Sequence, residues 1–292
     1  MQPTVGVVGL GLLGHAVAFR LLAAGHGVIG YDVLPEKVHA LAALGGKPAP
    51  SAEAVARAAE VVCTLLPSLA TVEAAVLGPE GVVAGARAGQ TLVQMSTISP
   101  ALTERLAREA GARGLAFLDC PVSGTSAMVA RGEGILLVGG ERAVFERWRP
   151  LLETILPRAV YIGRAGQATV VKLAANLLVG LHTAAAAEAL SLVRKAGLDP
   201  ARVLDVLTAS AGTSRMLELR GPMMVRHEFP PQMKLELFLK DLGLIVDVGT
   251  DVGAPLPLTT LARRLYAAAA ADGHGGEDLA VVTTALEGWR HP

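Results

Sequence analysis

The 292-residue chain is rich in hydrophobic residues (52%) and modest in charged ones (18%), a composition typical of a well-packed globular protein and not of a disordered one. Its 26 Lys and Arg equal its 26 Asp and Glu, so no broad positive surface for nucleic acid or an anionic membrane is expected. Its two cysteines, Cys63 and Cys120, lie far apart without metal-ligand spacing, which fits a reducing compartment. We expect a cytoplasmic protein whose partner is a small molecule, with no bound metal.

The N-terminal residues do not have the pattern of a signal peptide, because glycines interrupt the apolar run that such a peptide needs. Residues 170–193 form the one stretch of transmembrane length. Within it Lys172, Asn176, His182 and Glu188 would be costly in lipid. We therefore expect a buried helix between two domains, and no membrane partner.

The first thirty residues contain a valine-rich run, then Gly9-Leu10-Gly11-Leu12-Leu13-Gly14, then a helix-like stretch, and then a second apolar run that ends at Asp32. A strand, a Gly-x-Gly-x-x-Gly turn, a helix, a strand and an acid together make up the dinucleotide-binding fingerprint in its full context. Gly9 allows the tight turn, Gly11 lets the backbone approach a pyrophosphate, and Gly14 lets helix and strand pack closely.

Asp32 lies where a carboxylate accepts hydrogen bonds from the adenosine ribose and repels a 2′-phosphate, which favours NAD over NADP. Lys37 is the one nearby cation that would help to bind NADP, so NADP stays possible.

Short apolar runs and helical patterns alternate up to about residue 163, which predicts a doubly wound, mainly parallel sheet covered on both faces. Ligands bind such sheets beyond the carboxyl ends of the strands. The expected strands are residues 4–8, 28–31, 61–65, 91–95, 115–118, 135–138 and 159–162.

After Gly166 only helical patterns remain, so the second part is expected to be all α. The predicted domains are a Rossmann-like NAD(P)-binding domain over residues 1–163 and a helical substrate and oligomerisation domain over residues 164–292, joined by a long helix. The further helices expected in this part are residues 201–209, 214–224, 234–248, 256–271 and 277–289.

Four ordered motifs together resemble the β-hydroxyacid dehydrogenase family, which includes 3-hydroxyisobutyrate dehydrogenase and tartronate semialdehyde reductase. The resemblance covers the chain almost end to end. The motifs are the glycine turn at 9–14, Asp-Cys-Pro-Val-Ser-Gly at 119–124, Gly-Gln-Ala-Thr-Val-Val-Lys-Leu-Ala-Ala-Asn at 166–176, and Lys240-Asp241-Leu242. A late Gly-Gly-Glu-Asp-Leu-Ala-Val at 275–281 also matches.

The resemblance implies roles for individual residues. Lys172 matches the catalytic lysine of the family and Asn176 the asparagine one turn later. Ser123 and Gly124 match the loop that binds the substrate carboxylate, to which Thr125 contributes an N–H group. The positions that match the lining of the cofactor cleft are Leu66, Pro67, Thr71, Thr97 and Lys240.

The expected reaction moves a hydride between NAD(P) and a small 3-hydroxy acid while Lys172 exchanges the hydroxyl proton. A free lysine has a pKa of about 10.4, so a base at neutral pH needs a pKa of roughly 7–8, which burial on an apolar helix favours. Asn176, four residues later, lies on the same helical face and orients the substrate. His182 lies on a different face and is expected to be structural.

Thr125 and Ala175 depart from the family pattern, which often has glycine and asparagine there, and this leaves the substrate open. Residues 212–222 resemble a segment of threonate-type relatives, and tartronate semialdehyde or 4-hydroxybutyrate (succinic semialdehyde) chemistry are further alternatives. Val179 stands where the decarboxylating 6-phosphogluconate dehydrogenases have a glutamate, which argues against assisted decarboxylation. Imine reductases resemble the fold but typically replace the lysine.

An alternative from a different functional class is a cofactor-binding scaffold without turnover. The helical domain is rich in alanine and leucine, so its apolar faces predict a homo-oligomer, either a dimer or a tetramer.

Overall fold

The computed structural model describes residues 2–288, and it divides into two compact units, residues 1–172 and 173–292. The division falls inside one long helix, α9 (Gln167–Lys195), whereas the boundary expected from the sequence precedes that helix. The expected helix 277–289 ends at Trp289, which lies outside the described residues.

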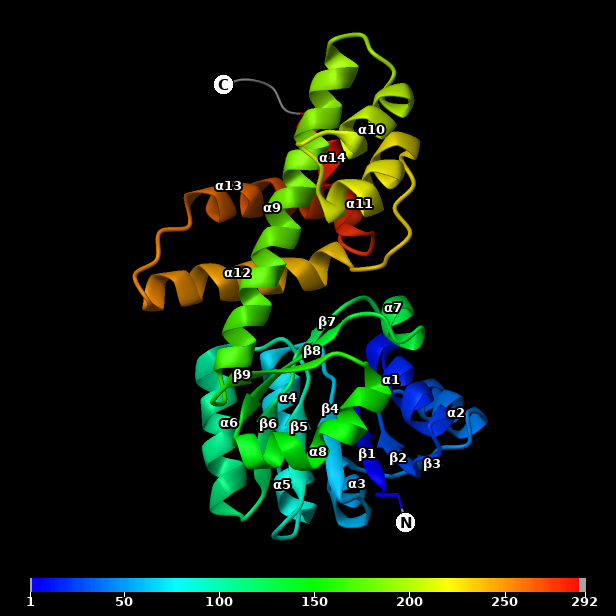
Figure 1. The fold of residues 1–292 in the computed structure, drawn as a ribbon, viewed down its shortest axis with the longest axis vertical. Helices are drawn as coiled ribbons and strands as arrows, with labels where there is room; N and C mark the ends of the chain where they lie inside the picture. The colour runs from blue at the N-terminus through cyan, green and yellow to red at the C-terminus, as the bar shows by residue number, and fades with distance from the viewer. Residues whose placement is uncertain (1, 289–292) are drawn as a thin grey trace. The chain divides into compact units, whose positions relative to one another are not determined.

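The first unit is built on one nine-stranded sheet with the strand order β3-β2-β1-β4-β5-β6-β8-β7, in which β9 also pairs with β8 (Figure 1). The strands are β1 (Val5–Val8), β2 (Val28–Tyr31), β3 (Lys47–Pro48), β4 (Val61–Thr64), β5 (Thr91–Gln94), β6 (Ala116–Asp119), β7 (Val122–Ser123), β8 (Ile135–Gly140) and β9 (Ala159–Gly163). Each predicted strand is present to within one or two residues. The two-residue strands β3 and β7 are too short to have given a sequence signal.

The sheet departs from the expected parallel pattern at one side, because β8 runs antiparallel to both β6 and β7. The reason is the connection between β6 and β8, which contains only β7 and the five-residue helix α7 (Ser126–Ala130). A parallel crossover usually runs through a full helix packed on the sheet. This connection instead places β7 antiparallel beside β8, so the chain returns in the opposite direction.

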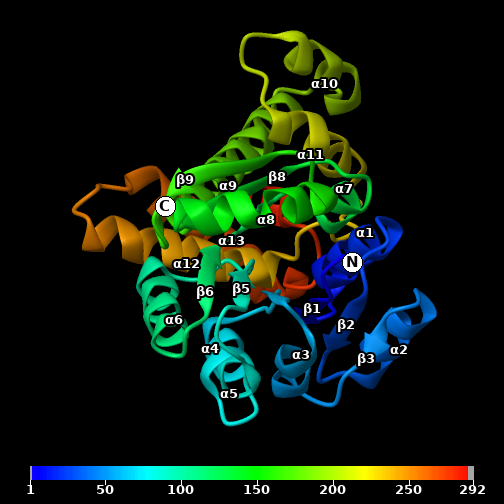
Figure 2. The same ribbon diagram turned by 60° about the horizontal axis from the view of Figure 1, so that its bottom comes forward.

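Helices cover both faces of this sheet (Figure 2). The flanking helices are α1 (Leu12–Ala23), α2 (Pro35–Ala43), α3 (Ala52–Ala58), α4 (Leu69–Leu77), α5 (Val82–Gly85), α6 (Pro100–Ala112) and α8 (Arg142–Ile155). Successive side chains of each central strand enter different cores: Cys63 packs with α1 and α8, and its neighbour Val62 packs with α3, α4 and α6. Because side chains on both faces of the sheet are buried, the sequence of each central strand is a continuous apolar run.

The register of the strands brings the candidate loops to one edge of the sheet. Val8 pairs with Thr64, Thr64 with Gln94, and Gln94 with Asp119, so β1, β4, β5 and β6 all end at the same level. The segments that follow these strands contain Gly9, Leu66, Thr97 and the loop before Ser123, as expected of ligand-binding loops in a doubly wound sheet.

The second unit is helical. Besides the larger part of α9, its elements are α10 (Pro200–Ala209), α11 (Arg215–Arg226), α12 (Leu235–Asp251), α13 (Pro257–Ala269), the short helices η1 (Ala270–His274) and η2 (Leu279–Val281), and α14 (Val282–Glu287). The Phe238 and Tyr266 rings meet edge to face at 5.5 Å, joining α12 to α13. The Tyr266 hydroxyl donates to the Gly180 carbonyl of α9 at 2.8 Å. Among the described residues, Lys234 and Asp278 pair as an isolated antiparallel β-bridge.

Helix α9 is the one helix in the described part of the chain whose length and composition would allow it to cross a membrane. Core helices of soluble proteins pass the same test, so this is weak evidence for a span.

Candidate active site

The glycine turn between β1 and α1 is closed by backbone packing. Gly9 has φ +91°, and a Cβ on it would lie 2.2 Å from the Leu65 carbonyl oxygen. A Cβ on Gly14 would lie 1.9 Å from the carbonyl oxygen of Gly9. Neither position accepts a side chain, because both neighbours are main-chain atoms.

Gly11 differs from these two glycines. A Cβ there would meet nothing within 4 Å, and its φ of −59° is open to any residue. Gly11 is also the N-cap of α1 and makes no side-chain cap, so the first N–H groups of the twelve-residue helix face this space. The open space beside this helix N-terminus fits the pyrophosphate of a dinucleotide, which a side chain at Gly11 would obstruct.

Asp32, at the end of β2, is fixed by two backbone groups. Its Oδ2 accepts from the Leu10 N–H at 2.7 Å and its Oδ1 from the Leu34 N–H at 3.0 Å. The carboxylate therefore ties the glycine turn to β2. Each carboxylate oxygen accepts more than one hydrogen bond, so this role leaves capacity for the ribose hydroxyls expected there.

The loops after β4 and β5 are linked by buried polar groups that sequence reasoning missed. Ser96 Oγ accepts from the Leu66 N–H at 2.8 Å, and the Ser96 N–H donates to Gln94 Oε1 at 2.7 Å. Both Ser96 and Gln94 are buried. They position Leu66 beside the residues that follow β5, where Thr97 is half-buried.

Pro67 and Thr71 adjoin the start of α4. Thr71 forms a reciprocal capping box with Ser68: the Thr71 N–H donates to Ser68 Oγ, and the Ser68 N–H donates to Thr71 Oγ1, both at 3.1 Å. This cap explains why a threonine suits position 71. It leaves the cofactor contact expected of Thr71 as a prediction.

The Ser123–Thr125 segment begins at the last residue of β7. A Cβ on Gly134 would lie 2.7 Å from the Ser123 carbonyl oxygen, so this loop packs closely on the start of β8. Thr125 is the N-cap of α7, where its Oγ1 accepts from the Met128 N–H at 3.3 Å. The threonine that departs from the family's second glycine thus has a local structural role.

Asp119, the first residue of the Asp-Cys-Pro-Val-Ser-Gly motif, anchors the start of α9. Its Oδ2 accepts from the N–H groups of Gly166 and Thr169, both at 2.9 Å, and its Oδ1 from the Thr169 hydroxyl at 2.7 Å. Burial raises the pKa of this fully buried carboxyl, and the hydrogen bonds from Thr169 and its neighbours oppose that shift. The motif therefore has a clear structural use at its first residue.

Lys172 and Asn176 lie one turn apart on α9, as the spacing predicted. Lys172 is half-buried, and Asn176 is 5% exposed. Few asparagines are buried to this extent unless their amide is hydrogen-bonded.

The partner of Asn176 within the second unit is Asp241 of α12. Asn176 Nδ2 donates to Asp241 Oδ2 at 2.7 Å, and the Lys240 ammonium lies 2.8 Å from the other oxygen, Oδ1. Asp241 is 2% exposed, so it is not a charge on the helix surface. The signal that was available is the apolar spacing of α12, which places Asp241 on the same face as Phe238 and Ile245.

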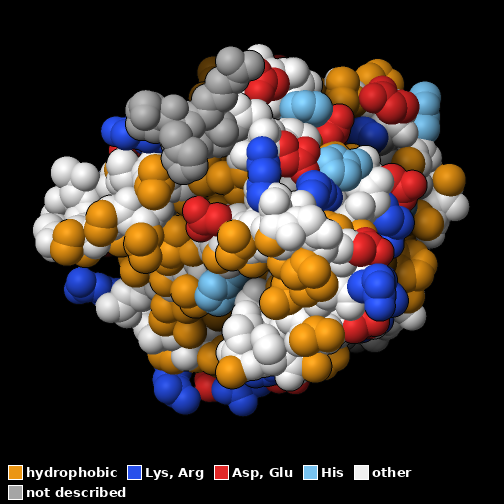
Figure 3. Space-filling view, turned by 90° about the horizontal axis from the view of Figure 1, so that it is seen from above, with side chains coloured by type: hydrophobic (Ala, Val, Ile, Leu, Met, Phe, Trp, Pro, Cys, Tyr) orange, Lys and Arg blue, Asp and Glu red, His pale blue; other side chains and the backbone are white. Residues whose placement is uncertain are grey.

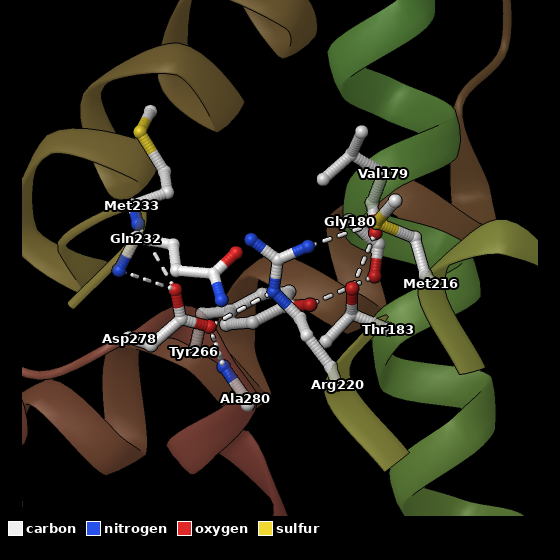
Figure 4. Close-up of polar contacts among 10 residues, drawn as sticks. All are labelled: Val179, Gly180, Thr183, Met216, Arg220, Gln232, Met233, Tyr266, Asp278 and Ala280. Atoms are coloured by element: carbon white, nitrogen blue, oxygen red, sulfur yellow. Dashed lines mark hydrogen bonds and ion pairs between the residues drawn. The ribbon is translucent and has the colours of Figure 1, made fainter. Parts of the chain in front are cut away.

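A second buried ion pair lies deeper in this unit (Figure 4). Arg220 Nε donates to Asp278 Oδ1 at 2.8 Å, and the two side chains are 6% and 0% exposed. Asp278 also accepts from the N–H groups of Gln232, Met233 and Ala280. Arg220 belongs to the 212–222 segment and Asp278 to the Gly-Gly-Glu-Asp stretch, so these two sequence patterns meet in one packing contact.

Among residues 2–288, no group of three or more His, Cys, Asp or Glu side chains is placed to hold a metal ion. Both cysteines are buried and free, and burial raises the pKa of the Cys63 thiol to about 12. His182 is exposed on α9.

Comparison with known proteins decides the family. Residues 4–163 match the model of the NAD-binding domain of 6-phosphogluconate dehydrogenase, and residues 166–286 match the NAD-binding model of NADP-dependent 3-hydroxyisobutyrate dehydrogenase. The L-threonate dehydrogenase of Cupriavidus necator is 36% identical over 100% of this chain and 99% of its own. The chain belongs to the β-hydroxyacid dehydrogenase family.

Two further members show the same end-to-end match. The 2-hydroxy-3-oxopropionate reductase of Escherichia coli K12 is 34% identical over 97% of both chains. The crystal structure of a 3-hydroxyisobutyrate dehydrogenase from Salmonella typhimurium is similar with a TM-score of 0.88 and 34% identity, over 96% of this chain and 99% of that one. Like its relatives, this β-hydroxyacid dehydrogenase is an NAD(P)-dependent oxidoreductase with a Rossmann-type first domain.

Proposed function

We propose that this family member oxidises a small 3-hydroxy acid of the 3-hydroxyisobutyrate kind to the corresponding semialdehyde, or catalyses the reverse reduction, with Lys172 as general acid and base. The observation that carries the proposal is α9, which presents the half-buried Lys172 one turn before the buried Asn176. The first turn of that helix is held by Asp119. The site therefore has an amine and an amide on one rigid element.

NAD, when bound, supplies the acceptor for the hydride that leaves the hydroxyl-bearing carbon. The proton of the same hydroxyl passes to the neutral Lys172 Nζ in oxidation, and the ammonium returns it to the carbonyl oxygen in reduction. Asn176 orients the hydroxyl. The Ser123 hydroxyl and the N–H groups of Gly124 and Thr125 bind the carboxylate of the acid.

We further propose that residues 1–163 bind the cofactor and that residues 164–292 form the substrate and oligomerisation domain. Asp32, whose carboxylate would repel a 2′-phosphate, supports NAD as the preferred cofactor. The residues proposed to hold it are Gly9, Leu10, Gly11, Leu12, Leu13, Gly14, Asp32, Leu66, Pro67, Thr71, Thr97 and Lys240.

A polyhydroxy acid such as threonate is the second candidate substrate. The end-to-end similarity to an L-threonate dehydrogenase supports it. The resemblance of residues 212–222 to threonate-type enzymes is weaker support, because Arg220 there is engaged in the buried ion pair and Gly221 packs against Leu204.

A steady-state assay with 3-hydroxyisobutyrate, glycerate, threonate and 4-hydroxybutyrate, each with NAD and with NADP, tests the function and ranks the substrates. Lys172→Ala should lower kcat by about 10²–10⁴-fold, the usual contribution of a general acid or base, and leave the Kd for NAD nearly unchanged. Lys195→Ala, which removes an exposed lysine at the other end of α9, should leave both constants as they are. NAD binding without turnover of any acid would instead identify a cofactor-binding scaffold.

We also propose that the protein is a cytoplasmic homo-oligomer. The second unit exposes large apolar side chains, including Leu178 (51%), Leu192 (71%) and Leu258 (67%), and hydrophobic side chains gather in patches on the face seen in Figure 3. Light scattering coupled to gel filtration measures the oligomeric state directly, and a monomer at micromolar concentration would rule this proposal out.

A further inference from the structure

Asp241 is a buried carboxylate of α12, and its two oxygens have different partners. Oδ2 accepts from the amide of Asn176 at 2.7 Å, and Oδ1 lies 2.8 Å from the ammonium of Lys240. A carboxylate at 2% exposure is costly to keep unless hydrogen bonds and a counter-charge compensate it. The amide and the ammonium supply both, so the arrangement is fixed and not incidental to an exposed surface.

The contact with Asp241 also determines which way the Asn176 amide faces. A carboxylate only accepts hydrogen bonds, and the amide nitrogen only donates them. The opposite orientation would place the amide oxygen against a charged oxygen and leave a buried N–H group without that acceptor, which is unfavourable. Asn176 Nδ2 is thereby held on Asp241, and Oδ1, on the other arm of the planar amide, is turned away from it.

We infer that Asp241 is a positioning residue that makes Asn176 a hydrogen-bond acceptor in the reaction. An acceptor oxygen one turn from Lys172 receives a hydrogen bond from the substrate hydroxyl, and so aligns that O–H group for transfer of its proton to the lysine. A donor in the same place would instead compete for the hydroxyl oxygen. This inference rests on the proposed function, and it assigns the amide oxygen, not the amide nitrogen, to the substrate.

Asp241 also holds Lys240, through its other carboxylate oxygen, Oδ1. Neighbouring residues on a helix point about 100° apart, so Lys240 reaches the Asp241 carboxylate by folding its long side chain back toward it. The Lys240 side chain is 25% exposed, against 3% for that of Asp241. One buried carboxylate therefore holds both a residue proposed to bind substrate and one proposed to bind cofactor.

Two substitutions of similar size separate the acceptor from the charge. Asp241→Asn removes the charge but keeps an oxygen that can accept from Asn176 Nδ2, whereas Asp241→Leu removes both. We expect Asp241→Leu to lower kcat about 10²-fold, the scale of a misplaced reacting group, with a small change in the KM of the acid. Asp241→Asn should retain kcat to within about tenfold. Asp247→Leu, at an exposed aspartate of the same helix, is the matched control and should match wild type.

A double-mutant cycle with Asn176→Ala tests whether Asp241 acts through Asn176. If it does, Asp241→Leu should reduce kcat little further once Asn176 is already alanine, because residues that share one interaction are not additive. Additive losses would contradict the inference, and so would equal losses in the Asn and Leu variants. Asp241→Ala replaces the Leu variant if the latter does not fold.

Crystal structures of the variants give a readout that does not depend on turnover. The Asn176 amide should keep its orientation in Asp241→Asn and rotate in Asp241→Leu, and an unchanged amide in the Leu variant would overturn the inference. Wild-type protein that turns over none of the acids would refute the proposed function, whereas active wild type with a fully active Asp241→Leu variant would refute only the role of Asp241.

Discussion

The glycine turn of the first unit and the polar pairs of the second unit fix their geometry in different ways. In the turn, main-chain atoms exclude side chains: a Cβ on Gly14 would lie 1.9 Å from the Gly9 carbonyl oxygen. In the second unit, side chains far apart in sequence hold one another: Asn176 and Asp241 are separated by 65 positions, and Arg220 and Asp278 by 58. A backbone constraint tolerates almost no substitution, whereas a side-chain pair tolerates loss of both partners better than loss of one.

A large loss of stability is expected from Gly14→Ala. The added methyl group would overlap a backbone oxygen that cannot move without opening the β1–α1 turn, so we expect a loss of about 3 kcal/mol or more in the free energy of unfolding. Thermal unfolding followed by circular dichroism measures this loss. A Gly14→Ala protein as stable as wild type would show that the turn is not closed as described.

Gly11→Ala tests cofactor binding by the same turn without a change in the fold. Nothing lies within 4 Å of the added Cβ, so stability should be unchanged, while the methyl group fills the space proposed for the pyrophosphate and weakens NAD binding. Calorimetric titration with NAD measures the change in Kd. Gly111→Ala, in the exposed last turn of α6 where a Cβ also meets nothing, is the control for any general effect of replacing glycine in open space.

The same contrast explains how much the sequence could predict. Gly9, Gly11, Gly14 and Asp32 lie within one strand–turn–helix–strand unit, so local spacing was enough to predict their arrangement. The capping box of Thr71 and the N-cap role of Thr125 are equally local, and neither tests the expected contact of Thr71 with the cofactor or of the Thr125 N–H with the substrate. A loop hydroxyl can cap a helix whether or not a ligand binds beside it.

The long-range pairs could not be predicted in this way. Asp241 follows Lys240 directly, and a charged pair of this kind in a helix does not by itself show which of the two residues is buried. Its partner Asn176 belongs to another helix, and only the packing of α9 against α12 brings the two together. Arg220 and Asp278 likewise belong to segments far apart in the sequence, and no local sequence pattern indicates that the two segments are in contact.

Arg220→Met should cost about 3–5 kcal/mol, because it leaves the Asp278 carboxylate buried without its counter-charge. Chemical denaturation monitored by fluorescence measures the change. Arg215→Met is the matched control: it removes an ion pair to Glu218 at 2.9 Å on the same helix, but the Arg215 side chain is 70% exposed, so its loss should cost less than about 1 kcal/mol. Equal costs for the two substitutions would show that burial of the pair does not determine its contribution.

Asp119 combines a long-range side-chain contact with a backbone constraint, because its buried carboxylate accepts hydrogen bonds from backbone N–H groups at the start of α9. Asp119→Ala removes the acceptor for Gly166 and Thr169 and should cost about 1–3 kcal/mol. Asp119→Asn, which keeps one acceptor oxygen, should cost less. A cost for Asn as large as that for Ala would show that the charge, and not the acceptor, holds the start of α9.

The contribution of Asp119 to stability changes with pH in the opposite direction to that of a carboxylate in a surface salt bridge. Burial raises the pKa of Asp119 above its ordinary value of 3.8, so the folded protein binds the proton more tightly than the unfolded chain does. The contribution of Asp119 to stability is therefore most favourable below pH 3.8 and falls as the pH rises through the raised pKa. Wild type should lose stability relative to Asp119→Asn over that interval, as measured by denaturant titrations at a series of pH values. A relative gain instead would mean that the hydrogen bonds from Gly166 and Thr169 outweigh the burial of the charge.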